Sequence, residues 1–465
     1  MQPKADSIRV ACTQQRGSDL ALPNQHIVGR RWPELWEQLR NAPTPRDVRE
    51  LSHTPEWTLR IDGIQLTSAY NRPSEARLQA ELVPENSREA HVYGIALGDL
   101  PRVLLERAQL ERLWVSIMSR SVARESLRLC DHSDWLGDPR VELLLANARS
   151  ELRRPYAVAP ACLSLAGARS ARLRDALYLD LQQPFRTAHF AELEAQLARQ
   201  MQRNRPLIAR DGDVRALYGR YRSQTAVVVA AGPSLDVQLD WLRAHRNRVR
   251  VIACTTALRS LCRAMVTPDV VAVVDHDPAM RRHLLNVDLE SLRGVPLVYV
   301  PSVDRGLLEA WRGPRLAAYL HRPRFAQLLR EQPRGRLFCA GTVAHACVDL
   351  AVKSGAREVV LLGFDFAFPA GRSHAQHAGS LHDLGRGAAP MHLRNRHGHE
   401  VPTNSSFLGY LRDLEAYIRR SAGVTFYQGR GEGALIAGTR ALEQLECGEA
   451  APAAETGRLE ELEHA

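Results

Sequence analysis

The sequence predicts an α/β protein whose central domain is a Rossmann-like, mainly parallel sheet with helices on both faces. A small N-terminal α/β domain and helical segments complete the predicted fold. From Thr225 onward, short apolar runs alternate with stretches of helical periodicity, which is the pattern of a parallel sheet covered by helices. Residues 227–231 are apolar without alternation, as in a strand that is buried on both faces.

The composition narrows the class of protein. The chain of 465 residues is 45% apolar and 25% charged, which is ordinary for a folded protein of two or three domains. The net charge of +10 rests almost wholly on arginine, since Lys4 and Lys353 are the only lysines. The basic residues are spread out instead of being interleaved with aromatics, so we expect no nucleic-acid partner. A modest preference for anionic ligands such as nucleotides fits this charge better.

The cysteines and the apolar runs indicate the compartment. The eight cysteines include no C-x-x-C pair. Four of them lie in apolar segments, as reduced core residues do; they are Cys254, Cys262, Cys339 and Cys347. The sequence starts without a basic-then-apolar signal and has no run of about 18 apolar residues. We therefore expect a cytoplasmic protein without a membrane span.

The chain divides into four predicted segments. Residues 1–160 form the N-terminal α/β domain, 161–220 a helical bridge, 221–445 the central domain and 446–465 an acidic, Glu-rich tail. The N-terminal domain should contain a hairpin that turns at Asp62-Gly63. It should also contain a strand that starts at His91 and runs into a glycine-containing turn ending at Asp99, and strands over 113–118 and 141–145. A nucleoside-binding unit usually has an acid at the end of its second strand. Here that end reads Ser116-Ile117-Met118, which favours a structural role without a ligand.

The central domain should alternate strands and helices. The predicted strands are 225–230, 249–254, 270–275, 295–300, 315–320, 336–340 and 358–363, and the predicted helices include 256–265, 323–332 and 343–354. Ligands of such sheets bind beyond the carboxyl ends of the strands. The residues that follow each strand are therefore the candidates for a site.

The most distinctive turn, Gly232-Pro233-Ser234-Leu235, follows the first of these strands. Gly232 allows a tight bend and the close approach of a ligand, and Pro233 ends the strand because it has no N–H. We expect Ser234 to cap the next helix, whose N-terminus could bind a phosphate. Neither a Walker loop nor a G-x-G-x-x-G fingerprint lies near the turn. A tight turn without a ligand is the alternative.

Polar residues also follow the other predicted strands. The position rule selects Thr255, Thr256, Asp275, Asp277, Ser302, Gly341, Thr342, Gly363 and Asp365. A carboxylate at a strand end can bind a sugar or a metal, or act as a base, and we expect Asp365 to face the cleft. Helix capping by Asp277 and Thr342 is the alternative role for those two residues. His345, one turn into its helix, belongs either to the core or to the rim of the site.

A histidine-rich loop follows Asp365 and contains His374, His377 and His382. Histidine titrates near neutral pH, which suits a general base. The spacing matches no standard zinc site and no cysteine joins it, so we expect no resident metal. A loop that closes over the substrate is the favoured interpretation.

Several of these segments resemble one known family in a fixed order. They are Gly232-Pro-Ser-Leu235, Gly341-Thr-Val-Ala-His345, Gly363-Phe-Asp-Phe-Ala367 with Ser373-His374, Gly398-His-Glu-Val-Pro-Thr403, residues 407–415 and Gly431-Glu-Gly-Ala-Leu-Ile-Ala-Gly438. The succession resembles the motility-associated factor (Maf) flagellin glycosyltransferases, whose central domain is similar to that of bacterial sialyltransferases. Tyr70-Asn-Arg-Pro-Ser-Glu-Ala76 and Val92-Tyr-Gly-Ile-Ala-Leu-Gly98 look like the N-terminal unit of that family. The chain departs from the usual pattern at Phe366 and Glu432.

The resemblance implies transfer of a nonulosonic acid, of pseudaminic or legionaminic type, from CMP to Ser or Thr of flagellin, as flagellum assembly and motility require. It makes residues 221–445 the catalytic, nucleotide-sugar-binding domain. Together with the strand-end rule, it leads us to expect donor binding by Gly232, Pro233, Ser234, Leu235, Thr255, Thr256, Ser302, Gly341, Thr342, Gly363 and Glu432. The candidate bases are His374, Asp365 and Asp275. It implies no cofactor besides the CMP-activated donor, although Mg²⁺ is compatible.

Two other functions fit part of the pattern. The Gly-Pro-Ser-Leu core also resembles archaeal 6-hydroxymethylpterin diphosphokinases, which would need ATP and Mg²⁺ held by acids such as Asp275 and Asp365. A non-enzymatic flagellin-binding protein on the same fold is the third candidate. The long N-terminal half and the segment 398–438 favour the glycosyltransferase.

Overall fold

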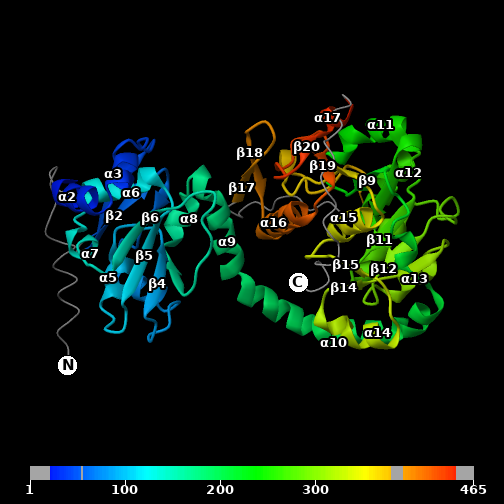
Figure 1. Ribbon diagram of the computed structural model, residues 1–465, viewed down its shortest axis with the longest axis horizontal. Helices are drawn as coiled ribbons and strands as arrows, with labels where there is room; N and C mark the ends of the chain where they lie inside the picture. Colours follow the sequence, from blue (N-terminus) through cyan, green and yellow to red (C-terminus); the bar gives the residue numbers. More distant parts are fainter. Residues whose placement is uncertain (1–20, 54–55, 379–390, 447–465) are drawn as a thin grey trace. The chain divides into compact units, whose positions relative to one another are not determined.

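The computed structural model describes residues 21–53, 56–378 and 391–446. The chain forms two compact units, Met1–Gln183 and Pro184–Ala465, each of which is an α/β arrangement (Figure 1). The boundaries expected near residues 160 and 220 stay predictions. His382 and nearly all of the acidic tail lie outside the described residues.

The first unit is built on a four-stranded parallel sheet. Its order is β6 (Val141–Leu145), β5 (Arg112–Ile117), β4 (Glu89–Tyr93) and β7 (Tyr156–Val158). An antiparallel sheet of β1 (Val48–His53), β2 (Glu56–Ile61) and β3 (Ile64–Gln65) accompanies it. The predicted hairpin is confirmed, because Asp62 and Gly63 connect β2 to β3 with positive φ angles of 47° and 84°. The three predicted strands are confirmed as β4, β5 and β6, whereas the three-residue β7 was not predicted.

Helices flank both sheets of the first unit. They are α2 (Ala21–Arg31), α3 (Pro33–Arg40), α4 (Arg72–Ala80), α5 (Asp99–Leu105), α6 (Arg120–Leu129), α7 (Ser133–Leu136), α8 (Pro160–Ser164) and α9 (Ala171–Leu181). Apolar residues of α2, α3 and α5 pack with those of β4, β5 and β6 in one core cluster.

The second unit is built on a nine-stranded parallel sheet, which confirms the predicted fold class. Its order is β20 (Arg440–Ala441), β19 (Thr425–Gln428), β16 (Glu358–Leu362), β9 (Thr225–Val229), β10 (Arg250–Cys254), β11 (Val270–Val273), β12 (Leu297–Tyr299), β13 (Arg315–Ala317) and β8 (Gly212–Asp213). Every neighbouring pair in this sheet is parallel.

Two short sheets stand beside this large one. The predicted strand at 336–340 does not join the large sheet, because β15 (Arg336–Leu337) pairs with β14 (Tyr319–Leu320) instead. An antiparallel hairpin of β17 (Met391–Arg394) and β18 (Glu400–Thr403) follows β16 in the chain. The sequence did not predict β8, β19 or β20.

Helices cover both faces of the nine-stranded sheet (Figure 1). They are α11 (Leu235–His245), α12 (Leu258–Arg263), α13 (Arg305–Ala310), α14 (Ala326–Glu331), α15 (Val343–Lys353), α16 (Ser405–Arg420) and α17 (Leu442–Glu446). The long helix α10 (Gln183–Arg210) contributes Met201, Leu207 and Ile208 to the core of this unit.

Strand β9 shows why the sequence there has no alternation. Val228 packs in one cluster with residues of α15, and Val227 and Val229 pack in another with Leu235 and Leu242 of α11. Both faces of the strand are thus covered, which requires apolar residues at every position. Between the sheet and α15, the Sγ atoms of Cys254 and Cys347 lie 3.7 Å apart, which confirms these two as free core cysteines.

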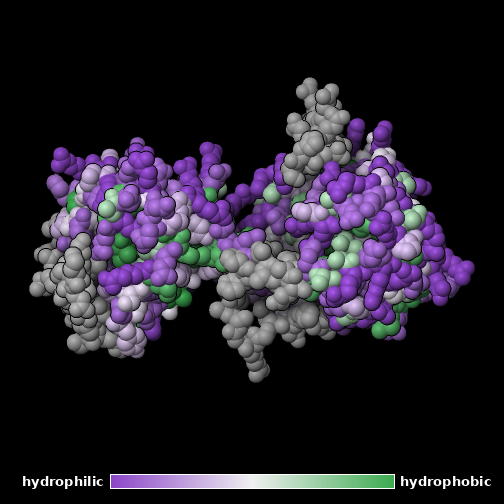
Figure 2. All heavy atoms as spheres, turned by 90° about the horizontal axis from the view of Figure 1, so that it is seen from below, coloured by the Kyte–Doolittle hydropathy of each residue, from purple (hydrophilic) through white to green (hydrophobic). Residues whose placement is uncertain are grey.

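The surface agrees with the charged composition. Figure 2 shows a face on which hydrophilic residues dominate and apolar residues form small groups. None of the helices in the described ranges is long and apolar enough to cross a membrane.

Candidate functional site at the crossover of the parallel sheet

The chain changes direction across the sheet at β9. From β9 the strands run outward through β10 to β13 on one side, whereas β16, β19 and β20 lie on the other side. Val229 and Leu362, the last residues of β9 and β16, are paired neighbours. Two loops therefore diverge at one point, which is where open parallel sheets bind ligands. These loops begin with residues 232–235 and 363–365.

Gly232 and Gly363 are required by the closeness of these two loops. The N–H of Gly232 donates to the carbonyl of Gly363 at 2.9 Å. A Cβ on Gly232 would lie 2.1 Å from Asp365 Oδ2 and 2.5 Å from that carbonyl oxygen. Gly363 has a φ of 70°, and its Cβ would lie 2.3 Å from the carbonyl oxygen of Ala230. Larger residues at either position would push the loops apart.

Asp365 lies beneath the Gly-Pro-Ser-Leu turn with only 3% of its surface exposed. Its Oδ2 accepts hydrogen bonds from the backbone N–H and the hydroxyl of Ser234, at 3.0 and 2.9 Å. Burial raises the pKa of Asp365 to about 6, against the lowering effect of the two Ser234 bonds. Its Oδ1 is buried and has no hydrogen-bond partner among the described residues.

Two expectations for this turn are corrected. Asp365 does not face an open cleft, because the turn and the segment after β19 enclose it. Ser234 stands at the N-terminus of α11 but makes no side-chain capping bond to the helix. Its hydroxyl donates to Asp365 instead, and a hydrogen bond to a carboxylate is stronger than one between neutral groups.

The N–H groups of the turn are all engaged inside the protein. Besides the bonds of Gly232 and Ser234, the N–H of Leu235 donates to Gly232 O at 3.0 Å and that of Asp236 to Pro233 O at 3.3 Å. Pro233 has no N–H. Phosphate binding by this turn stays a prediction, and an anion beside it needs further donors.

The segment after β19 closes over Asp365. A Cβ on Gly431 would lie 2.4 Å from Ser234 Cβ, and one on Gly433 would lie 2.5 Å from Asp365 Oδ1. The N–H of Ala434 donates to the carbonyl of Asp365 at 2.8 Å. Glu432 points outward, with 61% of its side chain exposed, and accepts a hydrogen bond from Asn395 at 2.6 Å.

The hairpin β17–β18 attaches to the other side of the Asp365 loop. The Thr403 hydroxyl donates to the carbonyl of Phe366 at 2.7 Å. The N–H of Phe368 donates to the carbonyl of Pro402 at 2.8 Å. Segments 232–235, 363–367, 398–403 and 431–438, far apart in the sequence, thus form one contiguous structure.

The described part of the histidine-rich loop crosses the ends of β9 and β10. The N–H of Ala375 donates to Ala231 O at 2.8 Å, and Ala375 packs against residues of α11 and α12. His374 is half-buried, and its Nδ1 lies 2.8 Å from the Ser373 hydroxyl. His377 lies beside Arg263, with Nδ1 3.0 Å from the guanidinium.

The remaining strand-end residues differ in exposure. Thr255 and Ser302 are buried, whereas Thr256 is half-buried. Asp275 is exposed over 48% of its side chain and accepts a hydrogen bond from the N–H of Asp277 at 3.0 Å. Asp277 caps the short 3-10 helix η5 (Pro278–Leu284) through the N–H of Ala279, which confirms the capping alternative.

The Gly341 segment contacts α16. A Cβ on Gly341 would lie 2.5 Å from the Tyr410 ring. Thr342 caps α15, which confirms that alternative. His345 is buried, with Nε2 2.9 Å from Tyr410 O and Nδ1 accepting from the N–H of Ala340 at 3.3 Å. Burial lowers the pKa of His345 to about 4, so it is a neutral core histidine.

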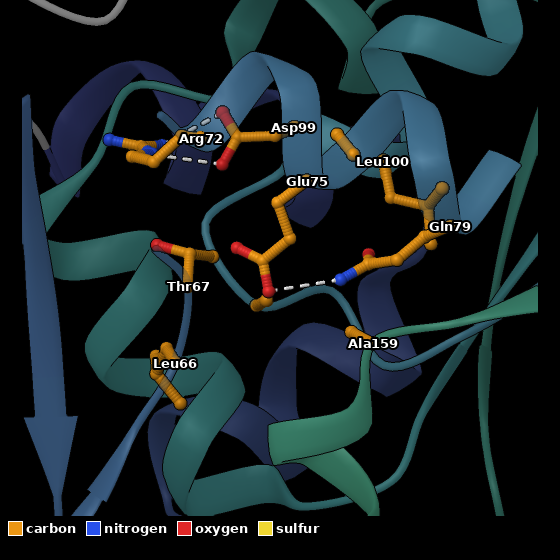
Figure 3. Close-up of a pocket in the computed structure, with 10 residues that line it drawn as sticks. Leu66, Thr67, Arg72, Glu75, Gln79, Asp99, Leu100 and Ala159 are labelled. Atoms are coloured by element: carbon orange, nitrogen blue, oxygen red, sulfur yellow. Dashed lines mark hydrogen bonds and ion pairs between the residues drawn. The ribbon is translucent and has the colours of Figure 1, made fainter. Parts of the chain in front are cut away.

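The first unit has a small cavity of its own, at the carboxyl ends of β4 and β7 (Figure 3). Arg72 and Asp99 form a buried ion pair beside it, with two N–O distances of 2.9 Å. Glu75 accepts hydrogen bonds from Gln79, at 3.2 Å, and from the N–H of Ser68. The polar groups around this cavity thus already bond to one another. The structural role without a ligand that we expect for this unit stays a prediction.

The described residues contain no group of three or more His, Cys, Asp or Glu side chains placed to hold a metal ion. One buried histidine near the loop, His283 on η5, was not singled out by the sequence. It lies in the basic run Arg281-Arg282-His283, which carries no motif.

Comparisons with known proteins give two kinds of likeness. The sequence profile of a family described as 6-hydroxymethylpterin diphosphokinase MptE-like matches residues 199–371. No curated protein sequence matches the chain. Among solved structures, a Maf glycosyltransferase from Magnetospirillum magneticum AMB-1 is similar at 18% identity and a TM-score of 0.43, over 92% of this chain and 75% of that one.

A spermidine synthase from Thermotoga maritima is also similar, at 18% identity and a TM-score of 0.19. That match covers 23% of this chain and 39% of the synthase.

Proposed function

We propose that this chain is a glycosyltransferase that moves a nonulosonic acid from its CMP-activated form to Ser or Thr of flagellin. The supporting observation is the convergence around Asp365. Segments 232–235, 363–367 and 431–438, which carry the resemblance to Maf proteins, meet there at contacts too close for a Cβ. This junction lies at the crossover of a parallel sheet, where such folds bind nucleotides.

In this proposal His374 is the general base. The acceptor hydroxyl attacks the anomeric carbon, the bond from that carbon to the phosphate oxygen breaks, and CMP leaves with the electron pair. The proton of the acceptor passes to His374, which is half-buried on a segment tied to Ala231. Asp365 positions the turn through Ser234. The exposed Asp275 is the second candidate for the base.

The donor lies along the ends of β9 to β12 in this proposal, near Thr255, Thr256 and Ser302. CMP leaves with a single phosphate, whose charge protein donors can stabilise, so the proposed reaction requires no resident metal. Both substrates meet in the cytoplasm, and the modified flagellin serves assembly and motility.

A second candidate is a 6-hydroxymethylpterin diphosphokinase-like enzyme. The family match over residues 199–371 favours it. In that case Asp275 and Asp365 would hold Mg²⁺ with ATP. The segment 431–438, which closes over Asp365, lies outside the matched residues, and this supports the glycosyltransferase.

A transfer assay tests the proposal. The purified chain, flagellin and a CMP-nonulosonic acid should give flagellin whose intact mass is higher by the mass of one sugar residue (the free sugar less one water), with or without EDTA. His374→Ala should lower the rate by roughly 10²- to 10⁴-fold, as loss of a positioned base does, while CMP still raises Tm. His377→Ala, on the same segment, is the matched control and should transfer at the wild-type rate.

Two results would contradict this proposal. Diphosphate transfer from ATP to the pterin alcohol, without sugar transfer, would favour the second candidate. Wild-type rates for His374→Ala together with an inactive Asp275→Asn would move the base to the end of β11.

A further inference from the structure

His283, on η5, is a buried histidine whose ring nitrogens find no hydrogen-bond partner in the described part of the chain. Only 2% of its surface is exposed, and neither Nδ1 nor Nε2 has a hydrogen-bond partner among the described residues. Its pKa is lowered to about 4, first by burial and then by the nearby charges of Arg282, His374 and Arg259, while Asp275 acts in the opposite direction. The ring is therefore neutral at neutral pH and offers one N–H donor and one acceptor.

Arg259 lies near this ring and also has a buried polar atom without a hydrogen-bond partner among the described residues. Helix α12, which carries it, packs against η5, and the guanidinium Nη2 donates to the carbonyl of Arg282 at 3.0 Å. Its Nε is buried and likewise has no partner in the described part of the chain. Two neighbouring residues on different elements thus hold polar atoms that are buried and that no described residue satisfies.

His345 shows what a satisfied buried histidine looks like in the same unit. Its two ring nitrogens bond to Tyr410 O and to the N–H of Ala340. Buried polar atoms in native proteins almost always have such partners, and an exception calls for a ligand, a water molecule or a catalytic role. His283 is such an exception, and it lies next to the loop that carries His374.

We propose that Arg259 and His283 form an oxyanion-binding subsite at the ends of β10 and β11. The guanidinium supplies fixed positive charge and the neutral imidazole supplies an N–H donor, a combination that suits a phosphate or a carboxylate. This inference rests on the proposed function for the identity of the ligand: a CMP-nonulosonic acid carries both groups. In the transfer step, charge grows on the phosphate oxygen as the bond to the sugar breaks, and Arg259 stabilises that charge.

The subsite also supplies the hydrogen-bond donors and the positive charge that an anion would not find at the Gly-Pro-Ser-Leu turn. The N–H groups of that turn are engaged within the protein, and the carboxylate of Asp365 sits against its helix N-terminus. A phosphate at the turn alone would meet a negative charge. Arg259 and Arg282 make the neighbouring strand ends the more favourable place for an anion.

Thermal unfolding with a set of probes tests the subsite. CMP, cytidine, ATP with Mg²⁺ and N-acetylneuraminic acid are each added to the wild type, His283→Leu, Arg259→Gln and the control Arg330→Gln, an exposed position on α14. CMP should raise the Tm of the wild type and of the control more than cytidine does. Both subsite variants should lose that difference, with CMP affinity falling about tenfold or more.

The probes identify which oxyanion is bound. Loss of the CMP effect alone assigns the phosphate, and loss of the N-acetylneuraminic acid effect alone assigns the carboxylate. Without ligand, His283→Leu should keep or raise Tm, because it removes an unpaired polar group. His345→Leu should lower Tm, because it leaves two partners unpaired. His283→Gln serves as the second variant should His283→Leu not fold.

The outcomes separate this inference from the proposed function. Equal shifts with CMP, and equal shifts with N-acetylneuraminic acid, in the wild type and both subsite variants would overturn the subsite and leave the glycosyltransferase standing. A shift with ATP but not CMP, lost in both variants, would support the subsite and overturn the glycosyltransferase. No shift of the wild type with any of the anions, or a drop in unliganded Tm for His283→Leu as large as that for His345→Leu, would also overturn the subsite.

Discussion

Gly232 shows how a single missing side chain shapes the site. An alanine Cβ there would lie 2.1 Å from Asp365 Oδ2 and 2.5 Å from Gly363 O. We expect Gly232→Ala to destabilise the second unit by about 1–3 kcal/mol, as overpacking does, and to lower Tm in a melting experiment. Gly294→Ala is the matched control, because a Cβ there meets nothing within 4 Å. Equal melting of both variants would show that the two loops separate easily.

At the level of single residues, the sequence predicted only part of the site. The turn at residues 232–235 is visible in the sequence, but the need for glycine at 232 comes from its closeness to Gly363 and Asp365, which a local pattern does not contain. The bonds between Ser234 and Asp365 are equally hidden, because they join residues 131 positions apart. His283 carries no motif, and its importance arises only from the neighbours that the fold places around it.

Helix α11 connects the elements around the crossover. Gln238, which is buried on this helix, accepts from the N–H of Gly363 at 2.9 Å and donates to the carbonyl of Arg430. One side chain thereby ties the loop after β16 to the loop after β19.

Replacing this side chain should loosen both loops. Gln238→Leu leaves two backbone groups unpaired, which should lower the free energy of unfolding by roughly 1–3 kcal/mol for each group. Gln238→Glu keeps only the acceptor. Its free energy of unfolding, measured by chemical denaturation, should therefore lie between those of the wild type and Gln238→Leu. The control Gln327→Leu loses only an exposed bond to Glu331 and should stay within about 0.5 kcal/mol of the wild type. Equal effects of Gln238→Leu and Gln327→Leu would refute the bridging role.

The elements themselves were easier to predict than their order. The apolar runs that became β9 to β13 and β16 are long enough to show in the sequence. By contrast, β8 and β20 are two-residue strands, too short for any periodicity. The place of β16 beside β9 depends on strand pairing across residues 225–362, which a local pattern does not contain. Strand order nevertheless decides which loops meet.

The whole molecule consists of two units with separate cores. Val92 and Val115 belong to a core cluster of the first unit, and Val228 and Leu350 to one of the second. Units with their own cores can unfold in separate transitions. We therefore expect two transitions in differential scanning calorimetry, of which CMP shifts only that of the second unit upward.

The buried ion pair of the first unit allows a test of whether a change in that unit moves only its own unfolding transition. Arg72 and Asp99 are 2% and 5% exposed, and removal of one partner of such a pair typically costs about 3–5 kcal/mol. Arg102 remains 3.9 Å from Asp99, so Arg72→Met should cost about 3 kcal/mol, the low end of that range. Only the transition of the first unit should move to lower temperature, while the CMP shift and sugar transfer persist. A single transition that responds to both Arg72→Met and CMP would mean that the two units unfold as one cooperative body. The site would then depend on the N-terminal unit for its stability.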